Sequence, residues 1–506
     1  MKKTVSLLLV LVLCVLMLPS CAQKGENEEP TASEGGYVLP TPVVRSDISL
    51  PYTSADVLSP YKSESEFNRD LLCTVFEGLF YPSQDGKGVP VLASSYENSG
   101  KTVTVKLGQG IRFSDGGELT APTVKSSFDK AKNSGWYSRS LSGIESAVAV
   151  DNYTVRFALS YPDDMVANVL DFPIVKEKGT ALYGTGSYKF AVLDGEPYLE
   201  INKYNRDYKE TDNPQIALYD MSGTSSPVYP FKANKISVYI NDLSDGAYNN
   251  LSSQTVSVPT NNLVYIGLNS SWQGSLTSID WVRHAINIGI NRNLIASSSF
   301  LGQTNPVVTP FKSEFYKLGG MELAELSGEV QRAVGILESH GYDTENAEGI
   351  RSNGNTLLKV SILVCSDNAY KVGVAENLAA SLKTLGFGVN IMEKNAEGFK
   401  DALEEGHFDM YIGEIELTAN CSLDPFFKNG GHASFGIDEE FFASYRSYML
   451  GETGVSQFIE SFYLQVPFVP LFYRNAVVSV NPNISGCSAA GQTPLYAGVS
   501  GWQFAG

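Results

Sequence analysis

The segment from residue 357 to residue 415 alternates strand-like apolar runs with helical runs. A β-α-β-α-β order of this kind predicts a largely parallel sheet with crossover helices, because a tight turn cannot join parallel neighbours. The expected elements are a strand at Leu357–Val364, a helix at Tyr370–Leu385, a strand at Val389–Met392, a helix at Gly398–Glu405 and a strand at Phe408–Ile415. In such sheets ligands bind beyond the carboxyl ends of the strands, so the loop 416–424 is a candidate ligand site.

The first half of the chain also contains both helical and strand periodicities. Residues Glu66–Leu79 carry apolar side chains at helical spacing, and a second helix is expected to begin near Thr120. Residues 102–107 alternate as a strand does, and hairpins are expected at 148–159 and 188–203. The chain is therefore expected to fold as an α/β protein.

Residues 1–20 have the layout of a secretory signal peptide. Lys2 and Lys3 precede the apolar run Leu7–Leu18, which is too short to cross a bilayer comfortably. The tetrapeptide Leu18-Pro19-Ser20-Cys21 resembles the lipobox of bacterial lipoproteins, which implies that Cys21 is acylated and becomes the new N-terminus. Two acyl chains would hold the protein at the outer face of the cell membrane, whereas the alternative is secretion with a free cysteine. Residues 21–36 are polar and without periodicity, so they are expected to form a flexible linker.

Charge and cysteine usage exclude several kinds of partner. The net charge of −18 argues against binding to nucleic acid or anionic lipid. After Cys21 four cysteines remain, which lie far apart and form no CxxC pair, so zinc or redox chemistry is not expected. Two disulfides could form in three ways, but buried thiols are favoured in a chain of this size. These cysteines are Cys73, Cys365, Cys421 and Cys487.

One group of residues has the composition of a metal site. Glu404 and His407 are three residues apart, but Gly406 interrupts the helix between them, so a solvated helix end is the favoured interpretation. The whole chain contains only four histidines. Neither a metal nor a cofactor is therefore expected.

A series of short segments resembles one protein family. Any single segment is a weak signal, but they occur in the expected order over nearly the whole chain. They are Val75–Leu79, Val89–Tyr96, Val105–Leu107, Phe113–Gly116, Leu119–Ala121, Gly184–Tyr188, Gly267–Asn269, Asp280–Ile286, Gly341-Tyr342 and Pro467–Phe472. Together they resemble the family 5 extracellular solute-binding proteins, which are the oligopeptide- and dipeptide-binding components of ABC importers.

The resemblance implies an α/β, two-lobed, type II periplasmic-binding-protein-like fold that closes on its ligand, with an additional domain embellishing the first lobe. Lobe 1 would comprise residues 37–58, 171–258 and 476–506, the additional domain residues 59–170, and lobe 2 residues 259–475. The β-α-β-α-β segment falls within lobe 2. The chain crosses between the lobes twice, which suits a hinge motion.

The resemblance also points to the loop after the last strand of lobe 2. Peptide binders of the family place an aspartate there to meet the ammonium group of the ligand, and this sequence has Cys421 at that position, or Asn420 with a one-residue shift. A neutral group forfeits a charge-assisted hydrogen bond of roughly 1.5–3 kcal/mol. Glu414, Glu416 or Asp424 could compensate, or the ligand is not a peptide. Alternatively, Asp424 only begins a turn before the following proline.

Four further residues are ligand-binding candidates by resemblance. Tyr265 and Asn269 lie on a strand whose family counterparts face the ligand, and Tyr473 ends a similar segment. Tyrosine hydroxyls and asparagine amides suit recognition of a peptide backbone, although core packing competes as an explanation of Tyr265. Asp56 falls where the first lobe would face the cleft, and it could equally be a solvated loop acid.

The sequence therefore predicts a lipid-anchored, monomeric substrate-binding protein that captures a peptide-like solute and delivers it to the permease and ATPase of an ABC importer. The same fold could instead bind an oligosaccharide, a metal chelate or an opine. A surface hydrolase or a sensor is the remaining alternative. No Gly-x-Ser-x-Gly and no His-Glu-x-x-His motif occurs in the chain, so an enzyme is not expected.

Overall fold

The computed structural model describes residues 47–504, apart from 212, 249–250, 322, 324–326, 355, 428–438 and 488–493. Contacts divide the chain into residues Met1–Pro42 and Val43–Gly506, and the described residues belong to the second unit. The predicted signal peptide, Cys21 and the predicted linker lie outside the described residues. Within the described ranges no helix has the length and apolar character that a membrane span needs.

The predicted β-α-β-α-β segment is present in the largest sheet. Strand β19 pairs in parallel with β20 on one side and with β21 on the other. The five elements are β19 (Lys359–Cys365), α7 (Ala369–Lys383), β20 (Gly388–Lys394), α8 (Ala396–Glu405) and β21 (Met410–Glu416). The order and type of all five elements are confirmed.

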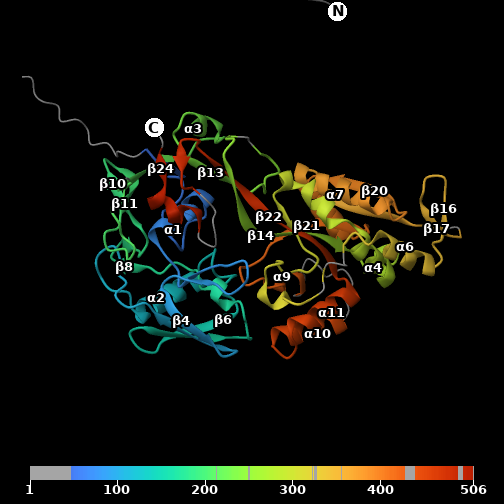
Figure 1. The fold of residues 1–506 in the computed structure, drawn as a ribbon, viewed down its shortest axis with the longest axis horizontal. Helices are drawn as coiled ribbons and strands as arrows, with labels where there is room; N and C mark the ends of the chain where they lie inside the picture. The colour runs from blue at the N-terminus through green and yellow to red at the C-terminus, as the bar shows by residue number, and fades with distance from the viewer. Residues whose placement is uncertain are drawn as a thin grey trace, which may run out of the picture. The chain divides into compact units, whose positions relative to one another are not determined.

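The prediction of a largely parallel sheet is wrong for this sheet as a whole. Its strand order is β13-β22-β14-β21-β19-β20, with β15 paired to β22, and every pair outside the β19 pairs is antiparallel. Two long strands, side by side in Figure 1, join the segment from distant parts of the chain. The added strands are β13 (Val238–Asn241), β14 (Thr255–Leu268), β15 (Thr304–Pro306) and β22 (Phe468–Val480).

Alternate side chains of this sheet enter two separate cores, as the two-residue period of a strand requires. Val264, Ile266 and Leu268 of β14 pack with one group of helices, whereas Leu263 and Tyr265 pack with another. The first group is α4 (Asp280–Gly289), α5 (Arg292–Ser297), α6 (Val330–Ser339) and α7. The second group is α8, α9 (Asp424–Phe427), α10 (Glu439–Met449) and α11 (Val455–Gln465).

The second sheet is antiparallel throughout, has the order β4-β5-β7-β6 and packs against one helix. The predicted strand at residues 102–107 and the predicted hairpin at 148–159 both belong to it, and the helix begins after Thr120 as expected. Its elements are β4 (Ala93–Asn98), β5 (Thr102–Leu107), α2 (Ala121–Lys132), β6 (Ile144–Ala149) and β7 (Thr154–Leu159).

A third sheet, with the order β1-β12-β11-β10, packs against helix α1 (Glu66–Val75) and the 3₁₀-helix η6 (Leu495–Gly501). The predicted hairpin at 188–203 is confirmed as β10 and β11. Helix α1 ends at Val75, four residues before the predicted end. There the backbone turns so that Gly78 lies against Asp171, where a Cβ atom would come within 2.5 Å of the Asp171 carbonyl oxygen. The strands are β1 (Ser49–Tyr52), β10 (Tyr188–Leu193), β11 (Glu196–Ile201) and β12 (Gln215–Asp220).

The remaining elements are short. They are β2 (Phe80–Tyr81), β3 (Val89–Pro90), η1 (Val166–Val169), β8 (Lys176–Lys178), β9 (Ala181–Tyr183), α3 (Val228–Lys232), η2 (Leu276–Ser278), η3 (Phe300–Gly302), η4 (Tyr316–Leu318), β16 (Thr344–Glu345), β17 (Arg351–Asn353), β18 (Thr356–Leu357), β23 (Ile484–Ser485) and β24 (Gln503–Phe504). The lobe boundaries given above stay a prediction.

Candidate functional site

A cavity of about 420 Å³ is lined by segments that lie far apart in the sequence. Helix α1 and the turn after it contribute to it, as do β14 and residues at the ends of β13 and β21. Its lining is rich in carboxyl groups and aromatic rings, namely Glu66, Asp70, Asp171, Asp242 and Glu416 with Phe76, Tyr81, Trp136, Tyr137 and Tyr496. Larger cavities of about 560 and 520 Å³ are lined by residues 187–211 with 500–503 and by residues 292–327. The 420 Å³ cavity is the candidate ligand site, because charged and aromatic groups from many segments converge on it.

Helix α1 presents its polar face to this cavity. Glu66, Arg69 and Asp70 occupy positions i, i+3 and i+4 of the helix and therefore share one side of it. The guanidinium carbon of Arg69 lies 3.9 Å from the centroid of the Trp136 ring, and a guanidinium nitrogen lies 4.0 Å from the Glu66 carboxylate. A cation in this position is attracted by the face of the indole ring.

Two carboxyl groups of the cavity hold their protons more tightly than an exposed aspartate does. Burial raises the pKa of Asp70 to about 7, and repulsion from Glu66 acts in the same direction. Burial also raises the pKa of Asp171 to about 7. Neither carboxyl group forms an ion pair with a residue in the described ranges. Both groups therefore gain from any positive charge that enters the cavity.

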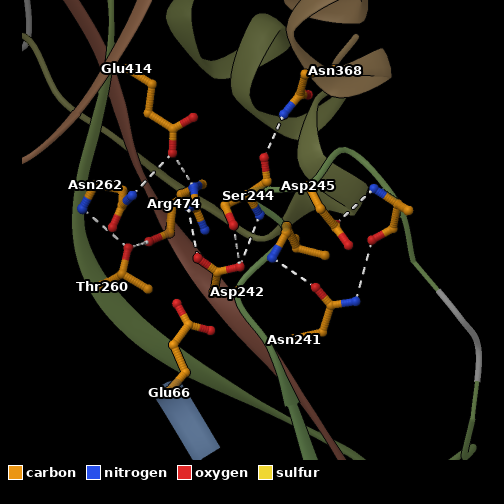
Figure 2. A network of polar contacts seen from close by, with 12 residues as sticks. Glu66, Asn241, Asp242, Ser244, Asp245, Thr260, Asn262, Asn368, Glu414 and Arg474 are labelled. Atoms are coloured by element: carbon orange, nitrogen blue, oxygen red, sulfur yellow. Dashed lines mark hydrogen bonds and ion pairs between the residues drawn. The ribbon is translucent and has the colours of Figure 1, made fainter. Parts of the chain in front are cut away.

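A network of polar side chains around the buried Arg474 and Glu414 lies next to the cavity (Figure 2). The guanidinium of Arg474 is fully buried, donates a hydrogen bond from Nε to Glu414 Oε1, and lies 3.4 Å from Asp242 Oδ2. Asn262 Nδ2 donates to the same Glu414 oxygen at 3.1 Å, and Lys371 Nζ lies 3.0 Å from the other one. Asp242 and Asn262 also line the cavity, so the network connects its wall to the neighbouring strands.

The charges of the network determine the state of Glu414. Burial acts to raise the pKa of Glu414, but the nearby cations Lys371 and Arg474 outweigh burial, so that its pKa is lowered. The carboxylate is thus ionised and held by two cations. Of the carboxyl groups predicted to compensate for the neutral loop, Glu414 lies in this network, whereas Glu416 lines the cavity itself.

Three other predicted site residues lie in the protein core. The Tyr265 hydroxyl lies 3.2 Å from the Tyr411 hydroxyl. Asn269 Nδ2 donates to the carbonyl oxygens of Gly406 and Phe408 at 2.7 and 3.0 Å, and the hydroxyl group of Tyr473 donates to a backbone carbonyl at 2.7 Å. None of the three lines the 420 Å³ cavity in the part of the chain that the structure describes. Their ligand-binding role stays a prediction.

The predicted ligand loop faces a different cavity, of about 460 Å³. Asn420 Nδ2 donates to Asp163 Oδ2 at 2.6 Å, and the buried Cys421 adopts a φ of +50°. Asp424 begins helix α9 and accepts a hydrogen bond of 3.0 Å from the Tyr445 hydroxyl. Burial raises the pKa of Asp163 to about 6. The structure thus brings Asn420 and Cys421 together beside Asp163, and leaves Glu416 at the candidate site.

Asp56 accepts hydrogen bonds from the residues that precede helix α1. Its carboxylate accepts from the Ser63 hydroxyl at 2.7 Å and from the backbone N–H groups of Glu64 and Ser65 at 2.8 Å each. The bond from the Ser65 N–H contributes most to lowering the pKa of Asp56, which falls to about 2. Asp56 therefore anchors the segment that leads into the helix.

Sequence reasoning identified Glu416 but missed the other charged groups of the cavity and the indole, namely Glu66, Arg69, Asp70, Trp136, Asp171 and Asp242. These residues belong to no motif and come from four separate segments. The one available signal was the polar face of the predicted helix at residues 66–79, which holds Glu66, Arg69 and Asp70.

Within the described ranges, no group of three or more histidine, cysteine, aspartate or glutamate residues is arranged to hold a metal ion. All four cysteines that the sequence analysis considered are free thiols, and Cys421 and Cys487 are buried as expected, whereas Cys73 and Cys365 are half-buried. Burial raises the pKa of the Cys73 thiol, which keeps it protonated.

Comparison with known sequences finds one family. A profile described as "Bacterial extracellular solute-binding proteins, family 5 Middle" matches residues 87–430. The glutathione-binding protein GsiB of Pectobacterium atrosepticum is 26% identical over 283 residues, which are 50% of this chain and 53% of that protein. The chain spans about half the length of the curated relatives it matches.

Comparison with solved structures shows the fold. The periplasmic murein tripeptide binding protein MppA, in an unliganded open form, matches 88% of this chain and 95% of its own with a TM-score of 0.69 and 18% identity. NikA from Brucella suis, in complex with Fe(III)-EDTA, matches 90% of this chain and 99% of its own with a TM-score of 0.63 and 18% identity. The predicted fold class, a two-lobed type II binding protein of mixed α/β type with an additional domain, is confirmed.

Proposed function

Because the chain belongs to the bacterial extracellular solute-binding proteins of family 5, we propose that it captures a peptide-like solute in the 420 Å³ cavity and delivers it to the permease of an ABC importer. Members of this family are solute-binding proteins, so binding without turnover is consistent with membership. The peptide-like ligand, its delivery to a permease and the membrane anchor are all parts of this proposal.

The convergence of distant segments on the cavity carries this proposal. Glu66 and Trp136 lie in the first third of the chain, whereas Asp242, Asn262 and Glu416 come from the strands of the largest sheet or from residues beside them. A cavity built in this way can be closed by a small movement of the segments around it. Closure removes water from the ligand, which strengthens its hydrogen bonds to the protein.

The neutral loop at residues 418–425 changes where a peptide ammonium group would be recognised. Asn420 and Cys421 carry no carboxyl group. In addition, Asn420 donates a hydrogen bond to Asp163, and Cys421 is buried. Asp70, Asp171 and Glu416 line the candidate site and form no ion pair with a residue in the described ranges, and we assign the ammonium group to them. Their negative charge also disfavours anionic ligands such as carboxylate-based metal chelates.

Calorimetric titration of the full mature chain with di- to pentapeptides tests the proposal. Saturable binding with a Kd in the micromolar range is expected, which corresponds to about −8 kcal/mol. Heats that show no binding at any peptide length, from protein that keeps its circular dichroism spectrum, would contradict the peptide assignment. Mass spectrometry of the bound peptide provides the control for catalysis, because a shortened peptide would identify a hydrolase.

The membrane anchor has a test of its own. Cys21 is the residue that the lipobox resemblance marks for acylation, and it lies outside the described residues. A Cys21→Ser variant should therefore fail to incorporate labelled palmitate and should leave the membrane fraction. A wild-type chain without label would show that acylation is not how the protein is held.

A further inference from the structure

We propose that the solute of the 420 Å³ cavity is positively charged: a short peptide-like chain that carries several ammonium or guanidinium groups. This inference rests on the proposed function and names the substrate class of the same site. It begins from an imbalance of charge. The described residues that line the cavity include five carboxyl groups but a single basic side chain, that of Arg69.

The charges that the protein itself provides do not balance this excess. Glu66 lies 4.0 Å from Arg69, and Asp242 lies 3.4 Å from the buried Arg474. The other three carboxyl groups, those of Asp70, Asp171 and Glu416, form no ion pair with any residue in the described ranges. Carboxylates gathered around a partly desolvated space repel one another, and a cation that enters the space relieves this repulsion.

The aromatic lining suits the same kind of ligand. The Arg69 guanidinium already lies over the Trp136 ring, 3.9 Å from its centroid, so the geometry for a cation against this ring exists in the cavity. The indole is 48% exposed and remains accessible to solvent. Aromatic faces beside carboxylates bind ammonium and guanidinium groups, whereas they offer nothing specific to an anion. Arg69 therefore occupies a position that a charged side chain of the ligand can share or take over.

The protonation of Asp70 and Asp171 supports this assignment. Burial raises the pKa values of Asp70 and Asp171 to about 7, so both groups are partly protonated near neutral pH, and a cation beside them favours their ionised forms. Asp70 faces Glu66, Arg69 and Cys73 on its own helix, Asp242 after β13, and Tyr496 on η6, while Asp171 faces Tyr137. Binding of a cationic peptide should therefore strengthen by about tenfold between pH 6 and pH 8, as the two carboxyl groups ionise.

Three tripeptides of different charge test the proposal by calorimetric titration of the full mature chain. Trilysine should bind at least about tenfold more tightly than trialanine at low salt, triglutamate should not bind, and the preference should shrink as salt is added. Equal affinity for trilysine and trialanine would overturn the inference and leave the proposed function standing. Absence of binding to all three peptides together with binding of spermidine would support a cationic ligand and remove the peptide from the proposed function.

Two variants locate the effect in the cavity. Asp70→Asn and Glu416→Gln each keep the shape of the side chain and remove its charge, so each should weaken trilysine binding by about tenfold and change trialanine binding by less than about twofold. Glu404→Gln on the exposed part of α8 is the matched control and should change neither affinity. Unaltered trilysine binding in both cavity variants would overturn the inference.

A third variant should act in the opposite direction. Arg69→Gln removes the arginine that neutralises part of the negative charge of the cavity. Trilysine should therefore bind to this variant at least about threefold more tightly than to the wild type. Damage to the fold would weaken binding, so a gain in affinity cannot be mistaken for it. Weaker trilysine binding in a variant with unchanged thermal stability would show that Arg69 does not compete with the cationic ligand, and would overturn the inference.

Discussion

Replacing Glu414 with glutamine should destabilise the protein, because two cations share its buried charge. Arg474 is 0% exposed, Glu414 is 7% exposed, and Lys371 lies 3.0 Å from the second carboxylate oxygen of Glu414. Removing one partner of a buried ion pair leaves the other charge without compensation, which typically costs about 3–5 kcal/mol. Arg474 keeps Asp242 at 3.4 Å, and Lys371 is 22% exposed, so we expect a loss at the lower end, about 3 kcal/mol.

The corresponding change in melting temperature is small because the protein is large. With an unfolding entropy of about 2.1 cal/mol/K for each of roughly 460 residues, a loss of about 3 kcal/mol lowers the Tm by about 3 °C. Urea denaturation resolves such a change better, because the midpoint and slope give the free energy of unfolding directly. Circular dichroism and tyrosine–tryptophan fluorescence should both be followed, since coincident transitions are needed for a two-state analysis.

The pH dependence of the free energy of unfolding shows whether the charge of Glu414 causes the loss of stability. The pKa of Glu414 is lowered in the folded protein, so its contribution is complete above the unfolded pKa of about 4.3 and is lost as pH falls below that value. The difference between wild type and Glu414→Gln should therefore be largest at pH 7 and should shrink toward pH 3.

Glu416→Gln, two residues along the same strand, is the matched control, and it should change the free energy of unfolding by less than about 0.5 kcal/mol. A Glu414→Gln variant as stable as this control at pH 7 would refute the reasoning.

Three further predictions concern residues outside this network. Asp163→Asn should remove a pH dependence of the free energy of unfolding. Because burial raises the pKa of Asp163 to about 6, the wild-type protein should lose stability as pH rises from about 4 to about 6. The urea midpoint of the variant should not show that loss. Gly413→Ala should cost about 3 kcal/mol in urea denaturation, because the new Cβ would lie 2.3 Å from Cζ of Tyr265, and a loss below about 0.5 kcal/mol would show that this contact relaxes freely. Asp424→Ala should cost about 1 kcal/mol through the lost hydrogen bond from Tyr445 and leave peptide affinity within about twofold, whereas a tenfold loss of affinity would identify Asp424 as a ligand contact.

Most secondary structure of the β-α-β-α-β segment followed from local periodicity. A run such as Lys359–Cys365 forms a strand because its apolar side chains are buried on both faces of a sheet, and that pattern is visible without the fold. The strands that pair with this segment could not be predicted from the sequence. Strands β14 and β22 reach the sheet from positions about a hundred residues before and fifty residues after the segment, and their antiparallel pairing depends on contacts that no local window contains.

The tyrosines show the same limit at the level of single residues. Tyr265 lies opposite Gly413, and Tyr411 lies opposite Gly267, in the register of β14 and β21. Each ring occupies the space that the facing glycine leaves, so the ring of Tyr265, a predicted ligand contact, packs in the core. A sequence shows that the glycines are present, but not which strand faces them.

The amino-acid sequence alone was sufficient for the fold class, the family and most of the helices and strands, because these follow from local patterns and from short motifs in a consistent order. The grouping of the candidate ligand-binding residues was decided by the tertiary structure. Asp70, Trp136, Asp171 and Glu416 form one cavity only after distant segments have packed together, and their shared burial produces the raised pKa values of the two aspartates. Electrostatic interactions depend on distance in space and on exclusion of water, and neither quantity is encoded at any single position of the chain.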